Sequence, residues 1–315
     1  MRRMGVLFFL FGSLRAQSQQ TITVVNSASF QPGMPHGGAL ATIFLSPSVT
    51  GWPGKPGLYG APPSAPLPPE LQNFRVYVNG AVAPILALVI PSDPTASAQI
   101  NIQVPLERNA TLGNINIGTG GLSPGGTVIV NGAVLSPLPE AGLGGFFQDA
   151  NGYLIAEHAS DGSLVTLQSP AHAGEQIIAF ADDFFPVWPP PPTGVPAPSA
   201  YAFFANTGDA QEVLGQYGND LYLQKYAPNP ACNNVPECGG YYTYTTTPAI
   251  SIAAETLAPN LIGVEEIVFT VPANQQPGDW ALFFNNGSCP DGRGAPCPGQ
   301  GPGSFSSPYA LLPVR

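Results

Sequence analysis

The segment AQINIQVP, residues 98–105, returns in altered form as EEIVFTVP, residues 265–272. Each copy follows a bend that contains proline, and each leads through a polar turn to a glycine and another apolar run. We interpret the two copies as equivalent core strands of two related β modules, because a duplicated strand with a duplicated turn indicates a duplicated fold.

Composition supports the same interpretation. The chain has 315 residues, which suits two domains that each bury a core. Charged residues make up only 9% of it, and its 37 glycines and 38 prolines punctuate short apolar runs, as is typical of an all-β protein. We predict two tandem immunoglobulin-like β-sandwich modules, residues 19–140 and 141–315, with an insertion at 184–246. The boundary is expected near residues 136–146, where SPLPEAGLGGF lacks apolar periodicity.

Short apolar runs between turn residues predict the strands. In the first module they are Ala39–Leu45, Phe74–Val78, Ile100–Val104, Asn114–Ile117 and Thr127–Val130. In the second they are Tyr153–Glu157, Ser163–Leu167, Gln176–Ala181, Ile250–Ala254, Ile267–Val271, Trp280–Phe284 and Tyr309–Val314. Tight hairpin turns are expected at Asn79-Gly80, Asn131-Gly132 and Asp161-Gly162, since these residues tolerate the positive φ that such turns need.

The N-terminus predicts export. Arg2 and Arg3 precede an apolar stretch that is too short to span a bilayer, and Ala16 and Ser18 offer cleavage positions, so we assign residues 1–18 to a signal peptide. We therefore expect a secreted or cell-envelope protein, extracellular or periplasmic, without a membrane span after cleavage. The formal net charge of −10 argues against nucleic acid and anionic membrane surfaces as partners.

All four cysteines lie in the second half of the chain, and an exported chain with an even count favours disulfides. Three pairings are open. We favour Cys232 with Cys238 and Cys289 with Cys297, because each pair flanks a short loop rich in Gly, Pro or Asn. A zinc site is the alternative, although the spacings differ from those of structural zinc knuckles.

Two unusual segments follow one another in the second module. Residues 184–200, FFPVWPPPPTGVPAPSA, are expected to form an extended loop or strap, because proline fixes φ and cannot donate to a sheet. Residues 201–244 hold seven of the eleven tyrosines and are the best candidate for a binding surface. The alternative is that these aromatic residues pack the insertion against the sandwich. The candidate ligand-binding residues are Trp188, Tyr201, Tyr217, Tyr222, Tyr226, Tyr241, Tyr242 and Tyr244.

A succession of motifs covers most of the mature chain. It runs through NSASFQPG (26–33), VYVNGAVAPIL (76–86), QINIQVPLE (99–107), SDGSLVTLQSPAHAGE (160–175) and LAPNLIGVEEIVFTVPANQQPGD (257–279). In this order the motifs resemble an uncharacterised paralogous domain of exported acidobacterial proteins, usually C-terminal, of roughly two hundred residues and thus ordinary domain size. The resemblance implies an exported, repeat-built β domain without an assigned activity, ligand or functional residue. The chain departs from the family in having Glu265 and Glu266 where a Tyr-Gln pair is usual.

Catalytic patterns are weak. The stretch Gly121–Gly125 matches a nucleophile elbow, but Pro124 lacks the backbone N–H that an oxyanion hole needs after Ser123. The trio His158, Asp161 and Ser163 surrounds a predicted turn, whereas a working triad takes its orienting group from the surrounding fold. The carboxyl pairs Asp182-Asp183 and Glu265-Glu266 are adjacent, so on strands their side chains would face opposite sides.

A metal or cofactor is not predicted. Calcium stays open, since an acidic exported chain carries oxygen ligands near turns at Asp149, Asn151, Asp161, Asp182 and Asp183. Turn formation explains several of these residues equally well. The ordered calcium loop motif is missing.

The sequence therefore predicts a non-enzymatic exported protein that binds or adheres at the cell envelope or outside the cell. The expected ligand is a glycan or a protein. A structural spacer without a ligand is the alternative, and an unrecognised hydrolase is the third possibility.

Overall fold

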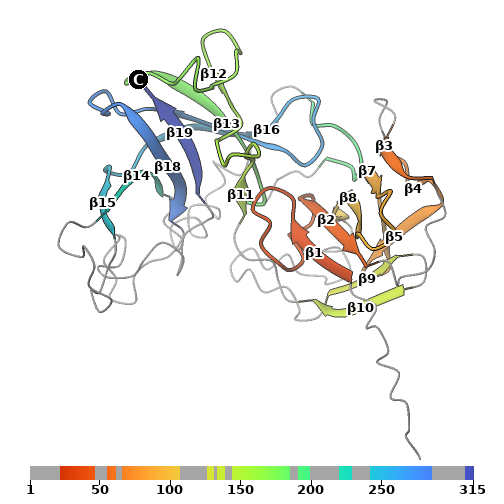
Figure 1. The fold of residues 1–315 in the computed structure, drawn as a ribbon. Coiled ribbons are helices and arrows are strands. Elements are labelled where there is room, and N and C mark those ends of the chain that lie inside the picture. The colour runs from red at the N-terminus through yellow and green to blue at the C-terminus, as the bar shows by residue number, and fades with distance from the viewer. Residues whose placement is uncertain are drawn as a thin grey trace, which may run out of the picture.

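The computed structural model describes residues 22–46, 55–61, 66–106, 126–130, 133–138, 144–184, 191–198, 220–228, 242–285 and 309–315. The elements in these ranges are β-strands, which confirms the all-β class. Within them, no helix is long and apolar enough to cross a membrane. Figure 1 shows two lobes, with β1 to β10 in the first and β11 to β19 in the second.

The first lobe contains two antiparallel sheets. One has the order β1-β2-β8-β7-β3; the other has the order β10-β9-β5-β4, with β6 paired to β5. The strands are β1 Ile22–Asn26, β2 Leu40–Leu45, β3 Gly57–Gly60, β4 Glu70–Leu71, β5 Phe74–Val78, β6 Ala81–Ala83, β7 Ile85–Ile90, β8 Ala98–Gln103, β9 Gly126–Val130 and β10 Ala133–Leu138. Ile43 of one sheet and Val76 of the other belong to one buried cluster, so the sheets enclose a common core.

The sequence pattern of β5 explains its place in this core. Phe74, Val76 and Val78 are buried, whereas Arg75 is exposed, as a strand period of two requires. Asn79 and Gly80 follow with φ of 49° and 84°, which turns the chain directly into β6. The predicted Asn79-Gly80 hairpin is thus confirmed.

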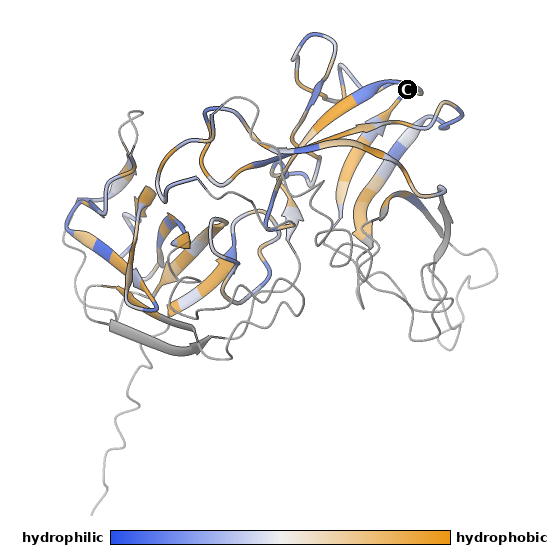
Figure 2. Cartoon of the chain, turned by 180° about the vertical axis from the view of Figure 1, so that it is seen from behind, coloured by the Kyte–Doolittle hydropathy of each residue, from blue (hydrophilic) through white to orange (hydrophobic). Residues whose placement is uncertain are grey.

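The second lobe repeats the two-sheet plan. One sheet has the order β11-β13-β17-β16, with β12 paired to β13; the other has the order β15-β14-β18-β19. The strands are β11 Gly145–Phe146, β12 Ala156–His158, β13 Gln176–Asp182, β14 Asp220–Pro228, β15 Tyr242–Thr246, β16 Ile252–Leu257, β17 Glu265–Thr270, β18 Gly278–Asn285 and β19 Ala310–Val314. Ile267 and Leu282 share a second buried cluster, separate from the first. Figure 2 shows the hydrophobic residues concentrated along these strands.

The two copies of the repeated segment become β8 and β17, each with a strand on both sides. Each also closes a hairpin: β7 leads to β8 through residues 91–97, and β16 leads to β17 through residues 258–264. Both copies are therefore central strands of their sheets. Aligned on their shared Val-Pro, the copies place Glu265 of β17 at the position of Ala98 in β8.

The predicted insertion needs a correction. Residues 220–228 form β14, which pairs with β15 on one side and with β18 on the other. Since β14 lies inside a sheet of the second lobe, this part of 184–246 is integral to the fold. Apolar alternation did not reveal β14, because tyrosines and charged residues interrupt its pattern.

Candidate functional site

A cluster of carboxyl groups lies where the second lobe meets the first. It forms at the end of β13, where Asp182 closes the strand and Asp183 turns out of it with φ of 64°. Because of this left-handed conformation, both carboxylates reach the segment between Asn26 and Leu40 of the first lobe. Our expectation that the pair would face opposite sides holds only for residues on a strand, and Asp183 lies beyond the end of β13.

Asp182 is completely buried and accepts two hydrogen bonds from the first lobe. Its Oδ1 accepts from the backbone N–H of Leu40 at 2.9 Å, and its Oδ2 accepts from Nδ2 of Asn26 at 3.0 Å. The Asn26 amide is oriented by its own turn, because its Oδ1 accepts the backbone N–H groups of Ala28 and Ser29. The NSAS sequence thus sets up an Asx turn that aims a donor at Asp182.

Asp183 contacts His36 in the loop between β1 and β2. Its Oδ1 lies 3.1 Å from the backbone nitrogen of His36 and 2.8 Å from Nδ1 of the imidazole. The carboxylate side chain is only 3% exposed, whereas the imidazole is 50% exposed. The other oxygen, Oδ2, is buried without a hydrogen-bond partner. Such an oxygen costs free energy in a native structure.

Glu265 of β17 completes the cluster. It is 4% exposed, and its Oε2 accepts the backbone N–H of Phe184 at 3.2 Å. Burial and the negative charge of Asp183 raise the pKa of Asp182 well above its usual range; Glu265 adds to the rise, and the bonds from Leu40 and Asn26 oppose it. Three carboxyl groups that repel one another are therefore held together in a site with little water.

Close backbone contacts surround the cluster. A Cβ added at Gly144 would collide with the carbonyl groups of Asp182 and Asp183, and one at Gly145 would lie 2.5 Å from Cβ of Ser29. In the loop between β16 and β17, a Cβ added at Gly263 would lie 2.8 Å from Cδ2 of Leu40. Glycine is required at Gly145 and Gly263 because the first lobe approaches closely there, and at Gly144 because the backbone of Asp182 and Asp183 in the same lobe does.

The strap crosses the same junction. Residues 191–198 are its described part, and they bond to both lobes. Gly194 donates its N–H to Oε1 of Gln103 at 2.6 Å and accepts from the N–H of Leu67 at 2.8 Å, both in the first lobe. Ala197 exchanges backbone hydrogen bonds with the 258–264 loop of the second lobe through Leu261 and Asn260. The strap therefore ties the lobes together.

A second polar cluster pins the loop after β12. Nδ1 of His158 lies 2.6 Å from Oε1 of Glu175, and Nε2 lies 3.1 Å from the carbonyl oxygen and 3.2 Å from Oγ of Ser169. Burial lowers the pKa of His158, but the bond to Glu175 and the contact with Ser169 outweigh it, so that the pKa is raised.

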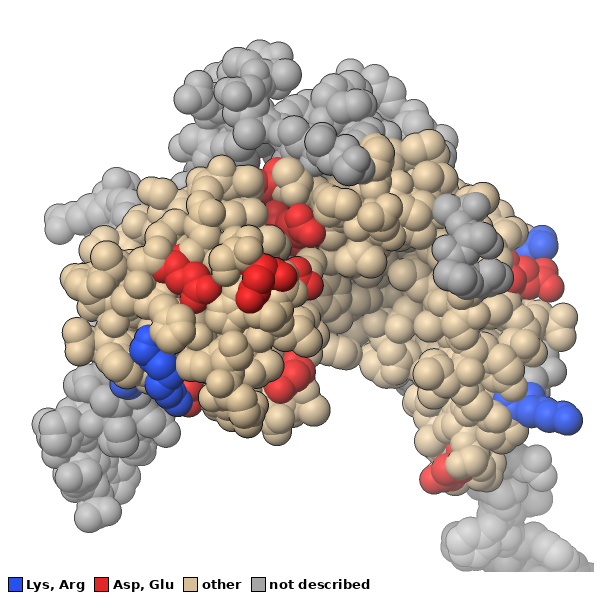
Figure 3. Space-filling view, turned by 90° about the horizontal axis from the view of Figure 1, so that it is seen from above, with Lys and Arg blue, Asp and Glu red and all other residues tan. Residues whose placement is uncertain are grey.

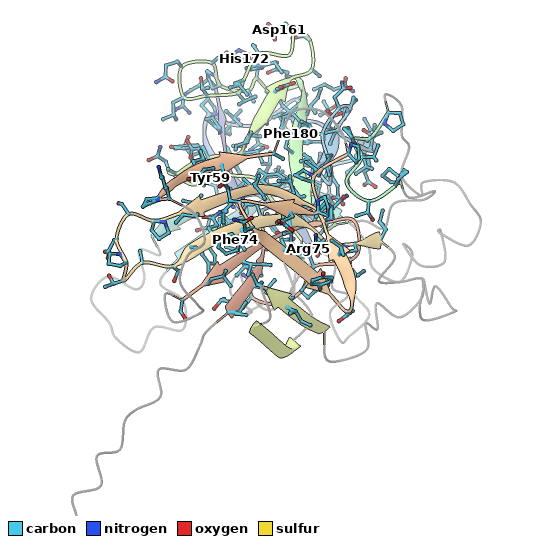
Figure 4. The ribbon with its side chains drawn as sticks, turned by 90° about the vertical axis from the view of Figure 1, so that its right-hand side faces the viewer. Tyr59, Phe74, Arg75, Asp161, His172 and Phe180 are labelled. Carbon is cyan, nitrogen blue, oxygen red and sulfur yellow. The ribbon has the colours of Figure 1, made fainter. Side chains whose placement is uncertain are left out.

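The geometry of this cluster resembles a Ser-His-Glu triad without meeting its requirements. A general base must present a lone pair to the serine hydroxyl, whereas Nε2 here faces a carbonyl oxygen, which accepts hydrogen bonds only. A doubly protonated imidazole satisfies both contacts. The trio His158, Asp161 and Ser163, which the sequence analysis set aside, is not formed either: Asp161 accepts the backbone N–H and hydroxyl of Ser163, which closes the turn. Figure 4 shows Asp161 at the tip of this loop region.

Few of the predicted ligand-binding residues fall where their side chains are described. Tyr222 of β14 is 5% exposed and stacks on Phe283, as the packing alternative expects. Tyr242 and Tyr244 lie on the edge strand β15. The backbone register pairs them with Pro228 and Tyr226 of β14, respectively. The remaining candidates and all cysteines lie outside the described residues: Trp188, Tyr201, Tyr217, Tyr241, Cys232, Cys238, Cys289 and Cys297.

The five oxygen ligands considered for calcium occupy three separate places. Asp149 closes a turn by accepting the N–H groups of Asn151 and Tyr153. Asp161 closes another, and Asp182 and Asp183 lie at the junction. Among the described residues, no group of three or more His, Cys, Asp or Glu side chains is placed to hold a metal ion.

Glu265 and Glu266 do face opposite sides of β17, as the strand period requires. Glu265 faces Asp182, whereas Glu266 lies near Glu157; its pKa is raised by burial and by the charge of Glu157. Sequence reasoning missed Asn26, His36 and Glu175 as partners. The alignment of the two copies could have singled out Glu265, since it replaces a buried alanine.

Comparison of the chain with protein-family models, with curated proteins and with solved structures finds no match in any of the three.

Proposed function

We propose that this chain is an exported, non-enzymatic scaffold of the cell envelope or extracellular space. Its two immunoglobulin-like β-sandwich modules, residues 19–140 and 141–315, are held at a fixed mutual orientation. The observation that carries the proposal is the junction, where Asp182 binds Leu40 and Asn26 across the two lobes in a buried site. The separate core of each lobe supports the division into modules.

The chemistry of the junction favours a fixed orientation over a flexible linker. Bringing Asp182, Asp183 and Glu265 into a buried site opposes stability, because each carboxyl group loses water. Asp182 and Asp183 accept hydrogen bonds from the first lobe whose geometry holds in one docked arrangement, and removing a partner would leave a buried charge unpaired. A polar contact of this kind adds specificity more than affinity, which suits a spacer that must keep one shape.

Small-angle X-ray scattering of the full chain tests this proposal. A rigid pair of modules gives a single maximum dimension that fits the two lobes of Figure 1 as one body. The variant Gly145→Ala, which places a Cβ against Ser29, is expected to broaden the distance distribution. The matched control is Gly60→Ala, where the added Cβ meets nothing within 4 Å. A broad distribution for the unmodified chain would contradict the proposal.

Binding of a glycan or protein is the second candidate function. It is favoured by the edge position of β15, which brings Tyr242 and Tyr244 to the border of a sheet beside β14. Deleting residues 201–244 would also remove β14 from the middle of the sheet, so substitution is the informative experiment. Replacing Tyr242 and Tyr244 together by threonine, which suits a strand, should abolish capture on a glycan array or in a pull-down. Unchanged capture would exclude these tyrosines.

A further inference from the structure

The outward side of one sheet in the second lobe is unusually apolar. The inward side of the sheet β11-β13-β17-β16 contributes Ile177 and Ile267 to the buried core. The outward side of an antiparallel sheet usually carries polar side chains, because it faces water. The β12-β13-β17 face, which is the outward side of these three strands and of the residues next to β12, instead carries Ile155, Leu164, Ile178, Phe180 and Val268.

The strand register makes these side chains neighbours. Leu164 pairs with Glu157, and Glu157 pairs with Ile178 on its other side. Ile178 pairs in turn with Val268. Paired residues of antiparallel strands point their side chains to the same side of the sheet, so these four form one row across it.

A second row lies beside the first. Phe180 of β13, labelled in Figure 4, pairs with Glu266 and donates its N–H to the carbonyl oxygen of Ile155 at 3.2 Å. Leu164 is 57% exposed and Ile155 is 39% exposed, so the β12-β13-β17 face is open to solvent. Apolar side chains that gather on an exposed surface mark an interaction site more often than single exposed ones do.

The repeated segment supplies an internal comparison. Glu266 and Val268 of β17 occupy the positions of Gln99 and Asn101 in β8. In the first lobe these outward residues satisfy one another, because Oδ1 of Asn101 accepts from Nε2 of Gln99 at 2.9 Å and from the hydroxyl of Thr42 at 3.2 Å. The second copy has an apolar side chain and a carboxyl group in their place. The two lobes therefore share their inward pattern and differ on this outward side.

The charges on the β12-β13-β17 face have one sign. Glu157 and Glu266 lie on the strands that flank β13, and in the described part of the chain neither has a hydrogen-bond or ion-pair partner. Burial and the charge of Glu157 raise the pKa of Glu266. A second copy of this chain would add its own two carboxyl groups to such a contact. A partner with Lys or Arg would neutralise them, which favours a basic partner of another sequence.

The width of the face suits a helix. Its apolar side chains span three neighbouring strands, which at a strand spacing of about 4.8 Å makes a band about 10 Å wide. An α-helix with its side chains is about 10–12 Å across, and helices pack an apolar stripe against the apolar face of a sheet. Basic residues beside that stripe would lie over Glu157 and Glu266.

We propose that the β12-β13-β17 face docks an amphipathic helix of another protein, whose apolar stripe is flanked by lysine or arginine. The site goes beyond the proposed scaffold role, because it gives the scaffold a specific cargo or anchor. It also lies on the other sheet of the second lobe from β15, apart from Tyr242 and Tyr244.

A synthetic peptide with a leucine stripe at helical spacing and lysines on both sides is the probe. Its matched control has glutamate in place of every lysine. We expect the lysine peptide to bind the full chain in fluorescence anisotropy and to gain helical circular dichroism on binding, a signal that is readable because the described elements of the chain are strands. No binding of the lysine peptide, or equally tight binding of the glutamate peptide, would overturn the proposal.

The apolar half of the contact is tested by copying the first lobe. Val268→Asn gives β17 the residue that β8 has at this position, and it should weaken binding about ten-fold or more, as removal of a central anchor does. Val82→Asn is the matched control, since Val82 is 40% exposed on β6 of the first lobe, and it should leave binding unchanged. Methyl NMR signals of Ile155 and Ile178 should shift when the peptide is added to the unmodified chain.

The charged half is tested in the same way. Glu266→Gln copies Gln99 of β8 and removes a repelled charge, so the fold should tolerate it. It should weaken binding about ten-fold through the lost charge pair and reduce the salt dependence of binding. Glu70→Gln makes the same change of net charge at an exposed position of the first lobe and should have little effect. Equal weakening by both variants would mean unspecific attraction to an acidic chain and would overturn the proposal.

Analytical ultracentrifugation tests the other occupant. A dimer of the unmodified chain that Val268→Asn dissociates would assign the face to a second copy and contradict the basic partner. Each of these results leaves the rigid scaffold untouched, because the β12-β13-β17 face lies wholly in the second lobe.

Discussion

At the residue scale, the junction depends on conformations that few side chains tolerate. Asp183 adopts a positive φ, which is uncommon outside glycine and asparagine and is tolerated by aspartate. This conformation turns its carboxylate toward His36 and puts two adjacent acids on the same partner segment. Gly145 permits the approach of Ser29 from the other lobe. Both residues are unremarkable in the sequence, because backbone strain and close approach leave no pattern in a single chain.

Gly145→Ala should destabilise the docked chain. The new Cβ would lie 2.5 Å from Cβ and 2.8 Å from Cα of Ser29, so the backbone must shift. Overpacking of this kind costs about 1–3 kcal/mol. Urea denaturation of Gly145→Ala beside Gly60→Ala measures the difference, and equal midpoints would show that the contact yields at no cost.

At the element scale, the sequence predicted the strands better than the site. The strong alternation in Phe74–Val78 fixed β5 to the residue, and the repeated Val-Pro segments located β8 and β17. The pattern failed at β14, where Tyr222, Gln224 and Lys225 hide a central strand inside a segment interpreted as an insertion. The polar partners were hidden for another reason: Asn26 and Asp182 are 156 residues apart, and only the tertiary fold joins them.

The equivalence of β8 and β17 predicts matched effects of core truncation. Ile100 and Ile267 occupy the same position in the two copies, and both are fully buried. Truncation to alanine should cost each lobe about 2–5 kcal/mol through lost burial and the cavity left behind. Hydrogen exchange resolved by lobe is the measurement. If Ile100→Ala and Ile267→Ala both weaken the same lobe, the two cores are not independent.

The His158–Glu175 pair should give the loop after β12 its own pH dependence. Because the pKa of His158 is raised in the folded state, the pair stabilises the loop at acidic pH, and this contribution is lost as the pH rises through the raised value. An NMR titration should place the His158 pKa above its usual 6.5, and Glu175→Gln should lower it. A His158 pKa that Glu175→Gln leaves unchanged would contradict the pairing.

At the scale of the whole molecule, acidity is distributed unevenly. The net charge of −10 keeps an exported chain soluble, and Figure 3 shows acidic side chains spread over the second lobe on the face seen from above. Among the described carboxyl groups, those with a raised pKa are Asp182, Glu255 and Glu266. All three belong to the second lobe. Burial raises the pKa of Glu255, on the edge strand β16, to about 7. Its register partner Ile267 is buried, so Glu255 points inward, as charged residues that protect sheet edges do.

The second lobe should therefore gain stability on mild acidification while the first changes little. Asp182, Glu255, Glu266 and His158 all have raised pKa values, so each contributes stability that falls as the pH rises through its folded value. Glu255 places part of this change near pH 7. In the first lobe, the bonds to Thr95 lower the pKa of Asp93, so its contribution to stability is lost only as the pH falls below 3.8.

Exchange protection measured separately for the two lobes from pH 8.5 to pH 5.5 should rise in the second and stay level in the first. Glu255→Gln should remove the step near pH 7, because a neutral amide at the same inward position no longer titrates. A parallel response of both lobes would mean that the junction, rather than the groups within the second lobe, controls the pH dependence.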